Sequence, residues 1–464
     1  MLLVGWSFVE GIGAVLVIPA IAALTAANYS GPERALAYGL LGGIAGAGVA
    51  AGPLIGGFIT TVLTWRVVFA AETVVVTAIL IFGIRRIEAG PSVAREPLDI
   101  VGAALSATGL GLVVFGILKS SQWGLILPSG ALEINGQRIT PFGLSVVPFI
   151  VVAGFLIVLL FRRWEQRQVR LGRTPLLRPD LMKVPQLRGG LTMFVSSYLL
   201  MAGTFFVVPL YLQLVIGDDT LETGIKILPI SIAMILAALA GARLADRASP
   251  RRIVRGGLWL LFIGLIGTFS TISPSLNSGL FAVSLAFFGA GVGLVVSQLG
   301  NVVMSSVGEA RASEAGGLSG ASQSLGSSLG TALIGAILLA GLTTGMHDRI
   351  RANESIPREV QQQIVEGTEQ GVPMVSSADV EDTVERAGLP PAQVQAVVDD
   401  YEDAQINALK QALLGAALFA LVALWLAGDL PATPLGAANA AERSRAAVHL
   451  EPAEQLEILI GASL

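Results

Sequence analysis

The chain contains no cysteine and has two histidines, His347 and His449, in 464 residues. Disulfide bonds, thiol catalysis and cysteine-ligated metals are therefore excluded, and a histidine-cluster metal enzyme is not expected. Lysine is also scarce, and none of the four lysines follows a glycine, so the chain has no GxxxxGK[ST] loop for ATP. The sequence thus predicts a protein that is not an enzyme, with no cofactor, no metal, no ATP and no nucleic acid partner.

Charged residues are few, at 13% of the chain, and hydrophobic residues make up 53%. A soluble domain has more charge and less apolar sequence, whereas runs of about 20 apolar residues suit the core of a bilayer. Eleven such runs can be placed, and the sequence therefore predicts an all-α polytopic membrane protein. They lie at residues 2–25, 36–60, 67–84, 100–118, 143–161, 190–216, 224–242, 256–272, 279–300, 316–342 and 409–427.

The distribution of basic residues predicts the orientation, because cytoplasmic loops retain arginine and lysine. The segment from Arg162 to Arg188 is rich in arginine, and a second basic stretch runs from Arg243 to Arg255. Both lie on the same side of the predicted spans. The N-terminus of this chain is therefore expected outside and its C-terminus in the cytoplasm.

The segment from Gly39 to Gly57 is unusually rich in glycine for a helix. Within a helix, glycine costs about 1 kcal/mol and proline about 3 kcal/mol relative to alanine, so the segment would be unstable in water. In lipid, glycines spaced four apart let a neighbouring helix approach closely, and a proline is tolerated. Five positions fit the pattern G-x-x-x-G-P-x-x-G-G: Gly48, Gly52, Pro53, Gly56 and Gly57.

This pattern resembles the antiporter motif in the fifth helix of major facilitator superfamily exporters. The resemblance implies a two-bundle transporter in which this helix is a stiff, bent interface between the halves. A later stretch resembles the superfamily's cytoplasmic gating motif, with Ser249 in place of its second glycine. An ordinary basic loop with one acid is the alternative interpretation of it. The residues assigned to this motif are Gly241, Asp246, Arg247, Arg251 and Arg252.

An odd number of spans does not suit a transporter built from paired repeats. We therefore expect three further spans before this sequence, as in the fourteen-helix drug:proton antiporter family that the motif resembles. The predicted units are an incomplete N-terminal bundle of three spans, two linker spans with a basic cytoplasmic loop, a six-span C-terminal bundle and a cytoplasmic tail. They cover residues 1–86, 87–188, 189–430 and 431–464, and the third includes an acidic extracytoplasmic loop at 346–408.

The predicted loops carry local signals. Asn135-Gly136 is typical of a tight turn at the tip of a hairpin. In the acidic loop, Pro357, Ser377 and Pro391 each open a short helical pattern. We expect three short amphipathic helices that cap the outer mouth, and solvated Asp218 and Asp219 nearby.

Two glutamates, Glu10 and Glu72, lie within predicted spans. A carboxylate at mid-bilayer costs about 2.5–3.5 kcal/mol, so such residues usually face the bundle interior. Both are candidates for proton coupling, and a structural hydrogen bond is the alternative for each. Five polar residues are candidate cavity lining, although interhelical hydrogen bonds would explain them equally well. These are Tyr198, Gln213, Gln298, Asn301 and Gln323.

A secondary transporter requires a cavity, a group that binds and releases a proton, and two conformations. The function implied by the resemblance is proton-coupled export of lipophilic or cationic small molecules from a bacterial cell, across its inner membrane. The expected partners are a small-molecule substrate, protons and the lipid bilayer. Two alternatives stay open, which are an exporter of an endogenous metabolite and a truncated, transporter-like scaffold that moves nothing.

Overall fold

The structure is a computed structural model, and nearly all of what it describes is helical. It describes residues 5, 9–29, 37, 41, 48, 52, 55–86, 99–126, 128, 132–134, 137–178, 180–245, 247–307, 311–368 and 371–433.

Nine helices in the described part of the chain are long and apolar enough to cross a membrane. They confirm the nine predicted spans that begin at residue 67 and beyond. The other two predicted spans are described in part, by helix α1 (Gly11–Asn28) and by helical residues 55–62. The nine are α3 (Trp65–Arg86), α4 (Ile100–Trp123), α5 (Val147–Arg170), α6 (Pro185–Leu210), α7 (Thr220–Leu244), α8 (Pro250–Thr271), α9 (Ser278–Ser305), α10 (Ala312–Ala352) and α13 (Pro391–Leu426).

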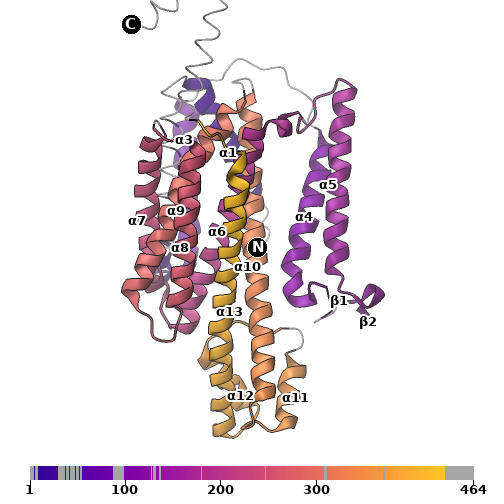
Figure 1. Cartoon of the computed structure of the whole chain (residues 1–464), viewed down its shortest axis with the longest axis vertical. Coiled ribbons are helices and arrows are strands. Elements are labelled where there is room, and N and C mark those ends of the chain that lie inside the picture. The colour runs from indigo at the N-terminus through magenta and orange to yellow at the C-terminus, as the bar shows by residue number, and fades with distance from the viewer. Residues whose placement is uncertain are drawn as a thin grey trace, which may run out of the picture.

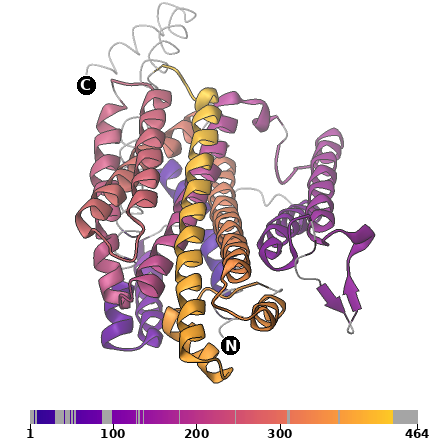
Figure 2. The same cartoon turned by 60° about the horizontal axis from the view of Figure 1, so that its bottom comes forward.

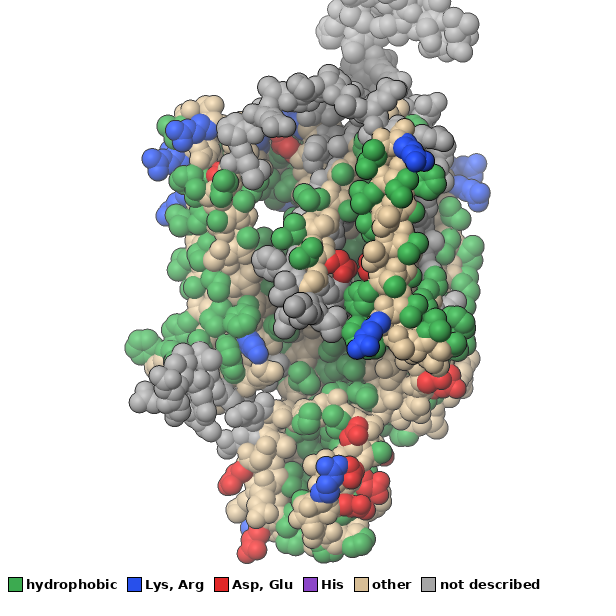
Figure 3. All heavy atoms as spheres, turned by 180° about the vertical axis from the view of Figure 1, so that it is seen from behind, with side chains coloured by type: hydrophobic (Ala, Val, Ile, Leu, Met, Phe, Trp, Pro, Cys, Tyr) green, Lys and Arg blue, Asp and Glu red, His purple; other side chains and the backbone are tan. Residues whose placement is uncertain are grey.

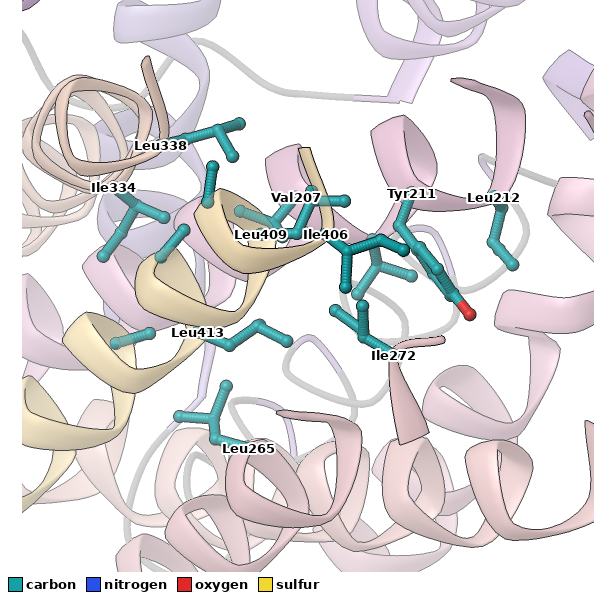
Figure 4. Packing of buried hydrophobic residues seen from close by; sticks show 14 of the residues in the cluster. Val207, Tyr211, Leu212, Leu265, Ile272, Ile334, Leu338, Ile406, Leu409 and Leu413 are labelled. Atoms are coloured by element: carbon teal, nitrogen blue, oxygen red, sulfur yellow. The ribbon is translucent and has the colours of Figure 1, made fainter. Parts of the chain in front are cut away.

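Six of these helices form a bundle around a continuous apolar core. Helix α6 packs against α9, α10 and α13, while α9 lies between α7 and α8. Leu265 of α8, Ile334 of α10 and Leu413 of α13 all lie in one buried cluster (Figure 4). The side chain of Tyr211 is fully buried in the same cluster and points its hydroxyl to the backbone of Ser273.

Helices α4 and α5 form a separate antiparallel pair to one side of the bundle (Figure 1). Helix α4 contacts α10, and this contact joins the pair to the bundle. A small hairpin lies at one end of the pair (Figure 2). Its strands, β1 (Leu132–Ile134) and β2 (Gln137–Ile139), pair antiparallel with Ile134 opposite Gln137. The predicted hairpin is thus confirmed, and its tip, 135–136, lies outside the described residues.

The acidic segment projects beyond the bundle as a helical cap (Figure 1). Two short helices, α11 (Arg358–Gly367) and α12 (Ser377–Arg386), begin as the sequence predicts. The third expected helix does begin at Pro391, but the prediction of a short helix is wrong. It is the start of the 36-residue α13, which continues into the last span, and α10 likewise runs on to Ala352.

The cap belongs to the same core as the bundle. Met346 and Ile350 of α10 and Val397 of α13 are buried in the cluster that also holds the apolar residues of the spans. Figure 3 shows apolar side chains over the long helices and acidic side chains gathered on the projecting cap. Side chains inside the cap are apolar and those on its outer surface are charged. Helices α10 and α13 therefore remain packed together where they extend beyond the apolar, membrane-spanning part of the bundle.

Short 3-10 turns flank three of the spans. Turn η2 (Pro141–Gly143) precedes α5, η3 (Leu181–Lys183) precedes α6, and η6 (Ala427–Asp429) follows α13. Helix α6 ends at Pro209-Leu210 and passes into a π-helical turn, η4 (Tyr211–Val215). A proline removes a backbone donor from the helix, and π-turns are frequent at functional sites.

Candidate functional site

Helix α10 makes its closest contacts at glycines. A Cβ on Gly326 would clash with the backbone carbonyl of Val195, and one on Gly330 would clash with that of Leu199. On α6, a Cβ on Gly203 would lie 2.5 Å from Cγ1 of Ile334. The two helices therefore touch backbone to backbone, as small residues permit in membranes.

Two of the candidate cavity residues flank this contact. Tyr198 of α6 is half-buried, and a Cβ on Gly326 would lie 3.0 Å from its Cβ. Gln323 is half-buried on α10, one turn before Gly326. The structure therefore places these two polar residues on two helices in contact, close to Gly326 in the sequence or in space.

The antiporter-motif glycines differ in their surroundings. A Cβ on Gly57 would lie 2.6 Å from the backbone oxygen of Thr220, the first residue of α7. Among the described residues, no heavy atom lies within 4 Å of such a position at Gly48, Gly52 or Gly56. Pro53 lies outside the described residues. Gly57 is thus a contact point between the N-terminal part of the chain and the six-helix bundle.

The two candidate proton carriers lie on helices that the rest of the chain covers little. Glu10 is half-exposed directly before α1, and Glu72 is exposed on α3. Neither carboxylate forms an ion pair or hydrogen bond with another described residue. The structure does not bring the two glutamates together. Helix α1, which Glu10 directly precedes, packs on α10.

Gln298 is joined to the predicted gating motif. Its side chain is 1% exposed, and its Nε2 donates to the backbone oxygen of Gly241 at 2.9 Å and to Ser297 Oγ at 3.0 Å. This residue therefore forms an interhelical hydrogen bond between α9 and α7, which is the alternative left open for it. Asn301, one turn further along α9, is half-exposed.

The gating-motif arginines take different positions. Arg251 is half-buried, and its Nε donates to the backbone oxygen of Leu430 at 2.8 Å, just beyond the end of α13. Arg247 and Arg252 are exposed, and Asp246 lies outside the described residues. Within the described part of the motif, Arg251 thus binds the backbone that follows the C-terminal end of α13.

A second arginine holds the same end. Arg188, at the start of α6, donates through Nη2 to Asp429 Oδ2 at 2.8 Å. Together Arg188 and Arg251 form a clasp that ties the C-terminal end of the last span to α6 and α8. Sequence reasoning missed this clasp, because Asp429 and Leu430 stand more than 170 positions from the arginines that bind them.

At the opposite end, Gln213 is exposed on the π-helical turn. Of the two aspartates expected in solvent, Asp219 is exposed, but the expectation for Asp218 is wrong. Its side chain is 8% exposed, and both its oxygens accept from Lys226 Nζ at 2.6 Å. The pair lies eight residues apart across the turn that starts α7, where Gly217 has a positive φ of 81° that glycine readily adopts. This fold-back of the loop brings the two charges together.

Comparison with known proteins identifies the family. The family model of the Major Facilitator Superfamily matches residues 1–331. The chain is 28% identical over 387 residues to a tetracenomycin C resistance and export protein of Streptomyces glaucescens. The match covers 82% of the chain and 65% of that protein. It is 25% identical over 337 residues to a probable actinorhodin transporter of Streptomyces coelicolor, covering 71% of the chain and 55% of the relative.

A third relative is the multidrug efflux pump LfrA of Mycolicibacterium smegmatis, 25% identical over 340 residues, with 73% of the chain and 63% of the relative covered. The chain thus spans less than two thirds of the length of these relatives. The family match covers most of the chain, and its helices are those of a multi-pass membrane protein. The chain belongs to the Major Facilitator Superfamily.

Proposed function

We propose that this chain is a proton-coupled exporter of lipophilic or cationic small molecules. The observation that carries the proposal is the superfamily match over residues 1–331, with relatives named for antibiotic resistance, export and multidrug efflux. The substrate class follows from these names and from an apolar chain that carries two glutamates within its predicted spans. An exporter of an endogenous metabolite is the closest alternative, and a test with several substrates separates the two.

The contacts at glycines support a rocking movement between two halves. Gly57 meets α7 at Thr220, and α1 packs on α10. At such contacts the helix backbones approach closely and no large side chains interdigitate. The two helices can therefore tilt against each other without repacking large side chains. In the proposed mechanism these surfaces are the pivots around which the substrate path opens alternately to each side.

Glu10 and Glu72 are the proposed proton carriers. A charged carboxylate on an apolar span costs about 2.5–3.5 kcal/mol at the bilayer centre, so either glutamate is stable there when it is protonated, paired or bound to a cation. An entering proton and a cationic substrate would therefore compete for the same carboxylate. The proton gradient supplies the energy, and the membrane potential adds about 2.3 kcal/mol per charge per 100 mV.

The proposed location is a bacterial inner membrane, with the acidic cap outside and the C-terminal tail in the cytoplasm. The support is the positive-inside rule, since the arginine-rich segment between α5 and α6 and the clasp residues Arg188 and Arg251 lie at the end opposite the cap. Cysteine placed at Ser376 in the cap should react with an impermeant thiol reagent added to whole cells, and cysteine at Ser305 should not. The opposite labelling would reverse the orientation.

Efflux in cells tests the proposed activity. Cells that express the chain are loaded with a lipophilic cationic dye, energised and followed by fluorescence. Loss of dye that stops on addition of a protonophore supports proton-coupled export. Equal retention in expressing and empty-vector cells would favour the alternative of a scaffold that moves nothing.

A further inference from the structure

Two carboxyl groups meet at the cytoplasmic end of the α4–α5 pair. Asp99 caps α4, where it accepts the backbone N–H of Gly102 at 2.8 Å and the indole N–H of Trp164 at 2.9 Å. Glu165 of α5 is 1% exposed, and its Oε2 accepts the backbone N–H of Leu177 at 3.0 Å. The Glu165 carboxyl also lies within hydrogen-bonding reach of that of Asp99.

Glycine at position 102 makes this approach possible. A Cβ there would lie 2.5 Å from Glu165 Oε1 and 2.7 Å from Asp99 Oδ2, so both oxygens converge on the bare α-carbon of Gly102. Glu165 Oε1 is buried and has no hydrogen-bond donor among the described residues. A buried acceptor of this kind costs about 1–3 kcal/mol when it is left unpaired. The convergence of two acceptors therefore needs an explanation.

No cation provides that explanation in the part of the chain that the structure describes. Asp99 is the charged group that acts on Glu165 there, and its effect is repulsive. The neighbouring charges on α5 are Arg162, Arg163 and Arg167, all exposed, and none of them forms an ion pair with Glu165. On the segment that follows, Arg173 is exposed and Arg178 pairs with Glu314 of α10 at 3.7 Å.

We propose that Asp99 and Glu165 form a proton-binding pair. In this pair Glu165 Oε1 carries the proton and donates a hydrogen bond to Asp99 Oδ2. One proton converts two repelling acceptors into a charge-assisted O–H···O bond, which is among the strong hydrogen bonds in proteins. It also satisfies the oxygen that lacks a donor. Asp99 keeps the negative charge, because the N–H groups of Gly102 and Trp164 already point at it.

The proton closes a latch between the linker helices and the bundle. Glu165 holds the backbone of Leu177, and the next residue, Arg178, reaches Glu314 at the start of α10. When the proton leaves, Glu165 becomes a buried charge beside Asp99 and is driven toward water. The Glu165 carboxylate then releases the backbone of Leu177. The adjoining Arg178 is no longer held beside Glu314 of α10. High cytoplasmic pH thus opens the latch, independently of whether Glu10 and Glu72 carry protons for transport.

Infrared spectroscopy of the full chain in lipid nanodiscs detects the proton directly. The wild type should show the carbonyl band of a protonated carboxyl at a pH where an ordinary glutamate, with a pKa of about 4.3, is ionised, and should lose it as the pH rises. Glu165→Gln should lose the part of this band that belongs to Glu165, whatever Glu10 and Glu72 contribute in both proteins, since its amide replaces the proton and keeps both contacts. Glu381→Gln, at an exposed glutamate of the cap, should retain it.

A second pair of variants keeps both carboxyls. Gly102→Ala must push them apart and should remove the band, whereas Gly111→Ala on the same helix meets no atom within 4 Å and should preserve it. Hydrogen exchange of the peptide that contains Leu177 reports the latch. At high pH it should be severalfold faster in wild type than in Glu165→Gln, with equal rates at low pH. Identical infrared spectra of wild type and Glu165→Gln would overturn the proton-binding pair, and a pH-independent exchange ratio would overturn the latch.

Discussion

The α-carbon of Gly57 lies directly against the backbone oxygen of Thr220, because a Cβ at position 57 would lie 2.6 Å from that oxygen. Among the four described glycines of the antiporter motif, this one touches the six-helix bundle. We therefore expect Gly57→Ala to separate the helix from α7 and to reduce dye efflux at least tenfold, since overpacking costs about 1–3 kcal/mol. Dye efflux normalised to the amount of protein in the membrane measures this.

Gly256→Ala is the control, because Gly256 of α8 is exposed and a Cβ added to it would meet no atom within 4 Å. This variant should transport like wild type. Equal efflux by Gly57→Ala and Gly256→Ala would show that the contact at Thr220 is not an interface used in transport.

The proposed proton carriers give a second prediction. Glu72→Gln and Glu10→Gln remove the titrating group and keep the size of the side chain, so each should abolish the response of efflux to a proton gradient without lowering the amount of protein in the membrane. The measurement compares dye efflux at several imposed gradients. Wild-type efflux in one of the variants would remove that glutamate from the mechanism.

Tyr401 joins α13 to the segment that precedes α12 in the cap. Its hydroxyl lies 3.0 Å from the backbone oxygens of Pro373 and Val375, which share its single O–H donor, and it accepts the N–H of Val375 at 2.9 Å. The residue is 1% exposed. Tyr401→Phe leaves the N–H of Val375 and the oxygen of Pro373 without this partner, at a cost of about 1–3 kcal/mol. We expect faster hydrogen exchange at 372–376, whereas Tyr29→Phe, at an exposed site, should change nothing there. Unchanged exchange in Tyr401→Phe would contradict this role.

At the clasp formed by Arg188 and Arg251, the two arginines should differ in their contribution to stability. Arg251→Ala removes the donor to the backbone oxygen of Leu430, a residue that is 0% exposed, and should lower the unfolding free energy by about 1–3 kcal/mol. Arg188 and Asp429 are about half-exposed, so Arg188→Ala should cost less than about 1 kcal/mol. Thermal unfolding in detergent ranks the two variants, and a larger loss in Arg188→Ala would reverse the assignment.

The sequence predicted the features that depend on local pattern. Apolar length located nine spans, Asn135-Gly136 located the hairpin, and Pro357 and Ser377 located the starts of α11 and α12. These signals need no knowledge of distant parts of the chain. Pro391 also marked a helix start, but its length could not be seen, because the acids of the cap interrupt an apolar pattern that the buried face of α13 continues.

Contacts between distant segments could not be predicted. The acceptor for Arg251 lies beyond the last span, and Asp99 and Glu165 are 66 positions apart in the chain. Gln298 could equally line a cavity or bridge helices until the position of Gly241 was known. Asp218 was expected in solvent. The turn at Gly217 brings it against Lys226 and buries it, and the local composition does not indicate this turn.

Transport by the purified full chain in proteoliposomes tests the central claim most directly. The vesicles are prepared with an acidic interior, and uptake of a lipophilic cationic dye is followed with and without a protonophore. Proton-coupled antiport predicts dye accumulation against its gradient, lost on addition of the protonophore and absent in Glu72→Gln vesicles. Accumulation no greater than in protein-free vesicles, or accumulation that survives the protonophore, would contradict the proposed function.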